Sequence, residues 1–196
     1  MSSIDRWYKK LWTARGARFN AYRRVKAIDK WSSAAIWMLS VYVIALNLIV
    51  FIPSSNEEDF SIHITIANIT LSVFILGLSL FVAGEDYKVE YHNHHELGKA
   101  LGPLYSKVSL AKDDQNTEVS LAEISKSYDE IIMRSSYNHY PIDYKYFKLQ
   151  NRKDFGLRRW EYPFIWFSYR VVPISMYLIL IVAPMVILVF LVIKIL

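Results

Sequence analysis

Three long apolar runs dominate the pattern of hydrophobic and polar positions along this chain of 196 residues. The runs 31–52 and 62–83 contain no Asp, Glu, Lys or Arg, and the run 171–196 contains one charged residue, Lys194. A helix of about 20 apolar residues can cross the hydrocarbon core of a bilayer, where it satisfies its own backbone hydrogen bonds. The pattern predicts an all-α membrane protein with a transmembrane hairpin over 31–83 and a third, C-terminal transmembrane helix over 171–196.

The segments outside these runs have helical periodicity. Residues 1–30 are basic and carry apolar side chains near one face, as in an amphipathic helix that lies on a membrane surface. In residues 84–170 the helix of the second span is expected to continue, and apolar stripes over 87–108 and 119–137 predict two helices. The stretch 138–164 is expected to be irregular. We therefore expect a cytosolic helical hairpin or stalk between the second and third spans.

Basic residues set the expected orientation, because Lys and Arg are enriched in the cytoplasmic segments next to transmembrane helices. Residues 1–30 carry nine Lys and Arg against two Asp, and residues 152–170 carry five. The loop 53–61 carries three acidic residues and no basic one. We expect the N-terminus and residues 84–170 to lie on the cytoplasmic side, and the loop 53–61 and the C-terminus to lie on the outer side. The residues expected to contact the inner leaflet are Arg15, Arg18, Arg23 and Arg24.

The formal net charge of +5 does not indicate nucleic-acid binding. Residues 84–170 hold 13 Lys and Arg and 13 Asp and Glu, so the excess of positive charge lies beside the membrane, where it attracts anionic lipid. The chain has no cysteine, which excludes disulfides, thiolate metal sites and cysteine nucleophiles. The expected partner is the lipid bilayer, with no direct contact to nucleic acid.

Polar side chains recur at helical spacing on both spans of the hairpin, so that they form a stripe on each helix. Such stripes either pack membrane helices together or border an aqueous pathway shared by several copies, and the spacing leaves both open. Acidic residues at the outer turn form either a cation-attracting ring or a solvated loop. The stripe residues are Ser33, Ser40, Asn47, Thr65, Asn68, Ser72 and Ser79, and the outer-mouth residues are Glu57, Glu58 and Asp59.

Candidate chemistry gathers in two short motifs. His92 and His95 share a helical face and, with His139 and Asp143, have ligand types suited to a metal, but their spacing matches no specific signature. The same histidines are suited to a response to pH. The second motif is Asn138-His139 followed by Asp143-Tyr144, which could act as an acid–base pair. No nucleophile stands near it in the sequence, so a capped turn is the favoured interpretation. We expect a non-enzymatic protein without metal or cofactor, with cytosolic regulatory candidates His92, His95, Asn138, His139, Asp143 and Tyr144.

Three stretches of the sequence resemble the SLATT family, the SMODS and SLOG-associating two-transmembrane effector domains of bacterial conflict systems. They are GARFNAYRRVKAIDKWSSAAIWMLSVYVIALNLI, then HHELGKALGPLYSKV, then ISKSYDEIIMRSSYNHYPIDYKYF. Asn138-His139 followed by Asp143-Tyr144 resembles a subgroup often encoded beside a reverse transcriptase. The resemblance covers about residues 10–150, so that the third apolar run lies outside it.

The resemblance implies a membrane effector of anti-phage defence. Such an effector would form a homo-oligomer, permeabilise the bacterial inner membrane and stop the infected cell by abortive infection. A reverse transcriptase or a nucleotide signal would supply the trigger. The alternative is a non-conducting membrane scaffold that anchors such a sensor. A third hypothesis, a metal-dependent membrane enzyme, would use His92, His95 and His139.

Overall fold

The computed structural model describes residues 2–49, 57–113 and 120–195, and every regular element within these ranges is helical. For residues 57–61 and for a few residues near the C-terminus it describes the backbone alone. The chain divides into two compact units. Unit 1 consists of Met1–Ala27 and Tyr87–Pro173, and unit 2 consists of Ile28–Asp86 and Ile174–Leu196. The predicted all-α fold is confirmed.

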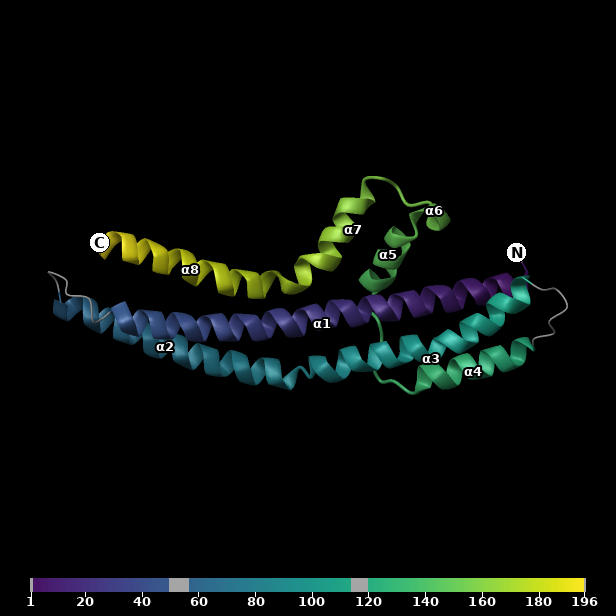
Figure 1. Ribbon diagram of the computed structural model, residues 1–196, viewed down its shortest axis with the longest axis horizontal. Helices are drawn as coiled ribbons and strands as arrows, with labels where there is room; N and C mark the ends of the chain where they lie inside the picture. The colour runs from purple at the N-terminus through teal and green to yellow at the C-terminus, as the bar shows by residue number, and fades with distance from the viewer. Residues whose placement is uncertain (1, 50–56, 114–119, 196) are drawn as a thin grey trace. The chain divides into compact units, whose positions relative to one another are not determined.

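Helix α1, Ser3–Ile49, contributes its N-terminal part to unit 1 and its C-terminal part to unit 2. The sequence predicted two elements here, an amphipathic helix over 1–30 and a span that begins at 31. The structure has one uninterrupted helix (Figure 1). From Ala17 to Ile49 the chain contains neither Gly nor Pro, the two residue types that most disfavour a helix interior. The boundary between the basic and apolar segments is therefore a change of surface chemistry along one helix.

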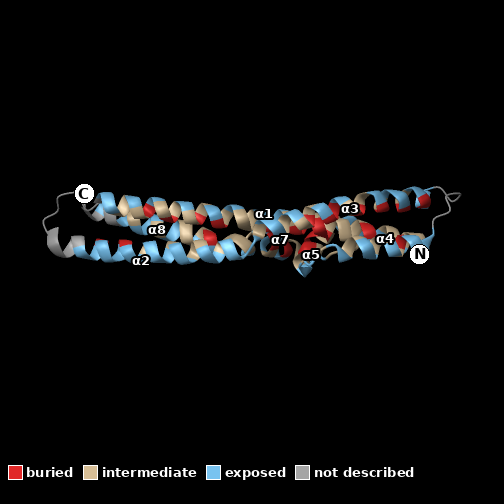
Figure 2. Cartoon of the chain, turned by 90° about the horizontal axis from the view of Figure 1, so that it is seen from below, coloured by how far each residue is buried: buried red, intermediate tan, exposed pale blue. Residues whose placement is uncertain are grey.

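Unit 2 contains the C-terminal part of α1, helix α2 (Glu57–Gly84) and helix α8 (Ser175–Ile195). The described chain has three helices long and apolar enough to cross a membrane, as predicted. Few side chains of this unit are buried, among them Leu39 and Ile64. Most of α2 is exposed, as its pale blue ribbon shows in Figure 2. Extensive exposed apolar surface of this kind is typical of a surface that faces membrane or a partner.

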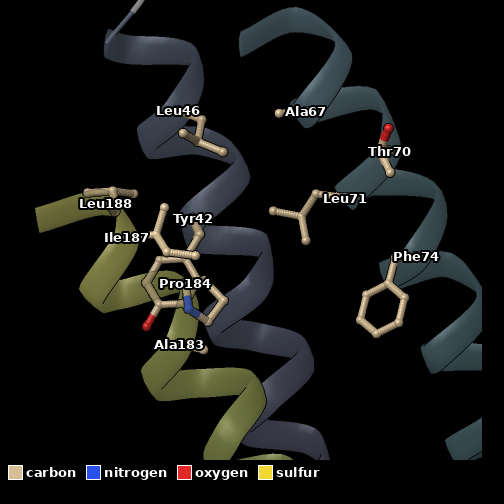
Figure 3. A pocket seen from close by; sticks show the side chains of 10 residues that line it. All are labelled: Tyr42, Leu46, Ala67, Thr70, Leu71, Phe74, Ala183, Pro184, Ile187 and Leu188. Atoms are coloured by element: carbon tan, nitrogen blue, oxygen red, sulfur yellow. The ribbon is translucent and has the colours of Figure 1, made fainter. Parts of the chain in front are cut away.

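In unit 2 a hydrogen bond joins α1 to α8, and an apolar groove lies beside it. The Tyr42 hydroxyl donates to the backbone carbonyl of Ile181 at 2.7 Å. Pro184 lies in the next turn of α8, where it lacks an N–H and its ring disturbs the hydrogen bonding of the preceding turn. Tyr42 thus supplies a donor to that turn. Beside it, an apolar groove of about 530 Å³ lies between α1, α2 and α8, with Leu71 and Phe74 on the α2 side (Figure 3).

In its described residues, unit 1 contains the N-terminal part of α1 and five further α-helices. Helix α2 ends at Gly84 and α3 begins at Tyr87, so the expected continuous helix is interrupted. Asp86 causes the break with a positive φ of 48°, a conformation that Asp tolerates better than most residues. A short 3₁₀ helix, η1 (Val172–Ile174), follows the last of the five. Those helices are α3 (Tyr87–Asp113), α4 (Leu121–Met133), α5 (Pro141–Gln150), α6 (Arg152–Phe155) and α7 (Glu161–Arg170).

An apolar core joins α1, α3 and α4. Leu11 of α1 packs with Leu101, Leu104 and Val108 of α3 and with Ile124 of α4. Helices α3 and α4 lie side by side (Figure 1), and the buried residues of unit 1 are red in Figure 2. The three core residues of α3, at positions 101, 104 and 108, follow the helical stripe that the sequence predicted.

Two glycines allow the helices of unit 1 to approach closely. A Cβ atom at Gly16 of α1 would overlap the ring of Phe147 on α5. A Cβ atom at Gly98 of α3 would lie 3.0 Å from the ring of Phe19 on α1. Both positions place an aromatic ring directly against a helix backbone, and this close packing brings the polar side chains of α1 within bonding distance of α3 and α5.

Candidate functional site

A cluster of buried polar side chains lies at the centre of unit 1. It consists of Arg18, Asn20 and Arg24 from α1, His94 from α3 and Asp143 from α5, each less than a tenth exposed. We call these five residues the buried polar cluster. Buried charged groups are rare unless they are paired, so the partners of each one define what the cluster does.

Arg24 and Asp143 form the ion pair of the buried polar cluster. The Arg24 Nε donates to Asp143 Oδ1 at 2.8 Å, and a terminal Arg24 nitrogen donates to Oδ2 at 3.0 Å. Asp143 Oδ2 also accepts the backbone N–H of Tyr140 at 2.9 Å, so that the carboxylate caps the first turn of α5. Pro141 at the start of α5 suits this turn, because its fixed φ matches the helix and the N–H that it lacks would have no partner within the helix.

Arg18 links α1 to α3 and to the segment before α5. One of its terminal nitrogens donates to the Tyr137 carbonyl at 2.7 Å and lies 3.3 Å from His94 Nδ1. The other donates to Asn138 Oδ1 at 3.4 Å. Because a guanidinium only donates, His94 accepts at Nδ1 and carries its proton on Nε2, which lies 3.6 Å from a Glu90 carboxylate oxygen.

Asn20 completes the cluster on the α5 and α7 side. Its amide nitrogen donates to the Asp143 carbonyl at 3.2 Å and to Gln150 Oε1 at 3.1 Å. The Tyr169 hydroxyl of α7 donates to the backbone carbonyl of Asn20 at 2.7 Å. The Tyr169 ring stacks on Tyr146 at 3.7 Å between ring centroids. Two successive turns of α1 are therefore hydrogen-bonded to α3, α5 and α7.

Burial and charge shift the pKa values of the cluster. Burial, followed by the positive charges of Arg18 and Arg24, lowers the pKa of His94 to about 4. Burial and Arg18 also lower the pKa of His139. Burial lowers the pKa of Arg18, whereas the hydrogen bonds and charge of Asp143 outweigh burial and raise the pKa of Arg24. The histidines are thus held neutral beside two charged arginines.

The structure does not gather the side chains that were considered as metal ligands. Among the described residues, no group of three His, Asp or Glu side chains is placed to hold a metal ion. His92 is exposed on α3, whereas the His95 ring packs against Tyr22 at 4.7 Å between ring centroids. His139 lies on the segment before α5, near Arg18. Among the described residues, the constellation of His92, His95 and His139 that the metal-enzyme hypothesis requires is therefore not formed.

Two of the regulatory candidates near α5 contact α1, and Tyr144 contacts α5 itself. Asn138 and Asp143 contact α1 through Arg18 and Arg24. Tyr144 is half-buried, and its ring lies below the Lys148 ammonium at 4.4 Å. The expected capped turn is present, and its cap is Asp143.

The prediction that four arginines contact the inner leaflet is wrong for Arg18 and Arg24. Both guanidinium groups are buried inside unit 1, where acceptors on α3, on α5 and on the segment before α5 bind them. Arg23 is exposed and donates to Asn20 Oδ1 at 3.2 Å. Arg15 is half-buried and lies over the rings of Phe19 and Tyr105.

The predicted polar stripe of α1 lies on an exposed face of unit 2. Ser33 and Asn47 are exposed and Ser40 is half-buried, whereas Ala35, Leu39 and Tyr42 form the buried face. Ser40 bonds back to the Ile36 carbonyl at 2.9 Å, and the Asn47 amide nitrogen donates to the Val43 carbonyl at 3.0 Å. The packing within unit 2 therefore leaves this stripe uncovered.

The stripe of α2 borders its buried face. Asn68 is buried within unit 2, Ser79 is half-buried, and Thr65 and Ser72 are exposed. Ser72 and Ser79 bond back to the Asn68 and Ile75 carbonyls of their own helix. Glu57, Glu58 and Asp59 begin α2, and their side chains lie outside the part of the chain that the structure describes.

The comparison with protein families agrees with this architecture. Residues 1–190 match the SMODS and SLOG-associating 2TM effector domain family 5. The chain belongs to this family. No curated protein and no solved structure matches it. The resemblance to SLATT effector domains is confirmed, and the family 5 match extends through most of the third apolar helix, beyond the two transmembrane helices of the family description.

Sequence reasoning missed three important residues of this SLATT effector domain. Asn20 and His94 are fully buried members of the polar cluster, and Tyr42 bonds α1 to α8. His94 lies on the predicted apolar stripe of α3, and that position was a signal of burial. Asn20 lies between basic residues, so its surroundings in the sequence resembled a solvated face.

Proposed function

We propose that this SLATT family 5 chain is a membrane effector of bacterial antiviral defence, which assembles into a homo-oligomer and permeabilises the inner membrane. Its action would end in abortive infection of the cell. Membership of a 2TM effector family and the three apolar helices support the first part of this proposal. The proposed effector acts without catalysis or a cofactor, and its orientation places the N-terminus in the cytoplasm and the C-terminus in the periplasm.

The exposed stripe of α1 carries the argument for assembly. Asn47 lies on an otherwise apolar part of the helix, among exposed side chains such as Ile44 and Leu48. Among the described residues its amide donates one hydrogen bond, to the Val43 carbonyl of its own helix, and an amide has further donor and acceptor capacity. A polar group with unused capacity is unfavourable in hydrocarbon. A second copy or a water-filled path would satisfy it, and both arise when several hairpins assemble.

Exposed and buried residues of the polar stripes have different roles in this proposal. The α1 stripe of Ser33, Ser40 and Asn47, together with Thr65 and Ser72, borders the path between copies. Asn68 is buried within a single chain, so we assign it to packing within the hairpin. A partner protein or a nucleotide signal supplies the trigger, and the family description, which names association with SMODS and SLOG modules, supports this. A reverse transcriptase is a candidate partner.

Induced expression in bacterial cells tests the proposal, with a membrane-potential dye and cross-linking of the membrane fraction as the two measurements. Wild type is expected to depolarise the cells and to cross-link as a homo-oligomer. Asn47→Leu is expected to abolish depolarisation, whereas the matched variant Ile44→Leu, which changes an exposed apolar residue one turn away, is expected to act as wild type.

Depolarisation and cross-linking together distinguish the possible roles of Asn47 and of the protein. Loss of depolarisation with cross-linking retained in Asn47→Leu supports a path-lining residue, and loss of both supports a packing residue in the same assembly. Wild-type protein that reaches the membrane but leaves the potential intact would contradict the proposal and favour the non-conducting scaffold.

A further inference from the structure

A basic hollow lies between α6 and α7 in unit 1. Arg152, Lys153, Arg159 and Tyr162 line a pocket of about 440 Å³. No carboxylate among the described residues forms an ion pair with its three cationic side chains. Asp154 and Glu161, the acidic residues next to them in the chain, are not paired with them either. Unpaired cations that converge on one hollow attract an anion with several acceptor oxygens.

Local structure holds the walls of this hollow in place. Gly156 ends α6 with a positive φ of 56°, and its N–H donates to the Arg152 carbonyl at 3.2 Å. The Tyr162 hydroxyl donates to the Leu157 carbonyl at 3.3 Å, and the Arg152 guanidinium lies over the Tyr162 ring at 5.6 Å. The exposed cations of the hollow thus stand on a tight turn and beside a cation–π pair.

An exposed aromatic face begins beside the hollow. Trp160, which follows Arg159 in the chain, is 68% exposed, Phe164 is 69% exposed and Phe167 is 51% exposed. Their spacing of four and three residues places them on one side of α7. The opposite side of α7 is buried through Ile165 and Tyr169. Helix α7 also ends only five residues before α8, a helix with membrane-spanning composition.

We propose that this basic hollow binds the phosphate of an anionic phospholipid headgroup, while Trp160, Phe164 and Phe167 lie in the interfacial layer of the same membrane. The two features have complementary chemistry, because aromatic side chains concentrate at the membrane interface and basic side chains there attract anionic lipid. A soluble phosphate would explain the hollow but not the aromatic face beside it. The inference is independent of the proposed permeabilisation, because lipid binding needs no open path.

Native mass spectrometry of the full-length protein in neutral detergent tests this inference. Phosphatidylglycerol and phosphatidylcholine are added in equal amounts, and bound lipids are counted. Wild type is expected to retain phosphatidylglycerol preferentially. In the triple variant Arg152→Gln, Lys153→Gln, Arg159→Gln, the ratio of bound phosphatidylglycerol to bound phosphatidylcholine is expected to fall at least about tenfold. Each basic residue near a membrane surface contributes about fivefold to the affinity for anionic lipid.

A matched triple variant controls for net charge. Lys126→Gln, Arg134→Gln and Lys145→Gln remove three exposed cations of unit 1 that lie away from the hollow, so the preference should persist. The variant Trp160→Gln, Phe164→Gln should weaken lipid retention. Equal loss in both triple variants would overturn the site. Displacement of the lipid by inorganic phosphate, with no effect of the aromatic substitutions, would show a soluble phosphate as the ligand and overturn the lipid assignment.

Discussion

The Arg24 guanidinium and the Asp143 carboxylate form a buried two-bond ion pair, although 119 residues separate them in the sequence. The exposed fraction is 8% for the Arg24 side chain and 0% for Asp143. The pair joins α1, which continues into unit 2 as a candidate membrane span, to the first turn of α5. The structure thus couples the basic segment of the chain to the Asn138–Tyr144 motif through a defined contact.

The variant Asp143→Asn should strongly destabilise unit 1. It leaves the Arg24 charge buried without its counter-charge, which lowers the free energy of unfolding by about 3–5 kcal/mol. Thermal unfolding of the purified protein in detergent measures the change. Asp129→Asn, at an exposed position on α4, should stay within about 0.5 kcal/mol of wild type. The double variant Arg24→Met, Asp143→Leu should recover part of the loss, and an Asp143→Asn protein as stable as wild type would contradict the assignment.

The variant Gly16→Ala should separate α1 from α5. The added Cβ atom meets the Phe147 ring, so either the ring or the helix must move, at a loss of about 1–3 kcal/mol in the free energy of unfolding. Gly77→Ala, where nothing lies within 4 Å of the new atom, should be neutral or slightly stabilising, because Ala favours the helix. Phe147→Leu in the Gly16→Ala background should restore part of the stability. Equal thermal stability of Gly16→Ala and wild type would argue against this packing.

The variant Tyr42→Phe should weaken the contact of α8 with α1. It removes the donor to the Ile181 carbonyl and should lower stability by about 0.5–2 kcal/mol, the range for hydrogen bonds between membrane helices. A double-mutant cycle with Pro184→Ala provides the control. The N–H restored at position 184 pairs with the Leu180 carbonyl four residues earlier and not with that of Ile181, so the loss caused by Tyr42→Phe should keep its size in the Pro184→Ala background. A loss that shrinks in that background would show that Tyr42 compensates for the proline.

Stability should fall in mild acid because of His94. Its pKa is about 4 in the folded protein against an ordinary value of 6.5, so the unfolded chain binds more protons between these values. The stabilisation is complete above pH 6.5 and is lost as pH falls from 6.5 to 4, by up to about 3 kcal/mol. The lowered pKa of His139 acts in the same direction. Thermal unfolding across this range measures the slope.

Two histidine variants on α3 make the pH prediction specific. His94→Gln keeps an acceptor for Arg18 but does not titrate, so the slope between pH 4 and 6.5 should flatten. His92→Gln changes an exposed histidine on the same helix and should keep the wild-type slope. If His94→Gln retains the full slope, another group is responsible for the acid sensitivity.

The sequence alone determined the fold class and the number of candidate spans. Long runs without charged residues have few stable arrangements other than membrane helices, because each run carries its own hydrophobicity and its own backbone hydrogen bonds. The apolar stripe of α3 was equally readable, since helical spacing is a local property of the chain. The stretch 138–164 was read as irregular although it contains α5 and α6, because its aromatic and basic residues have no simple periodicity.

Only the tertiary structure decided which polar residues face inward. Arg18 and Arg24 have the same local sequence character as Arg23, yet the two are buried and Arg23 is exposed, because their partners come from α3, α5 and the segment before α5. Asn47 and Asn68 both interrupt apolar spans, yet Asn47 is exposed and Asn68 is buried. Such differences arise from contacts between residues distant in the chain. Local composition and spacing did not identify the partners of these residues, because the packing of one helix on another determines them.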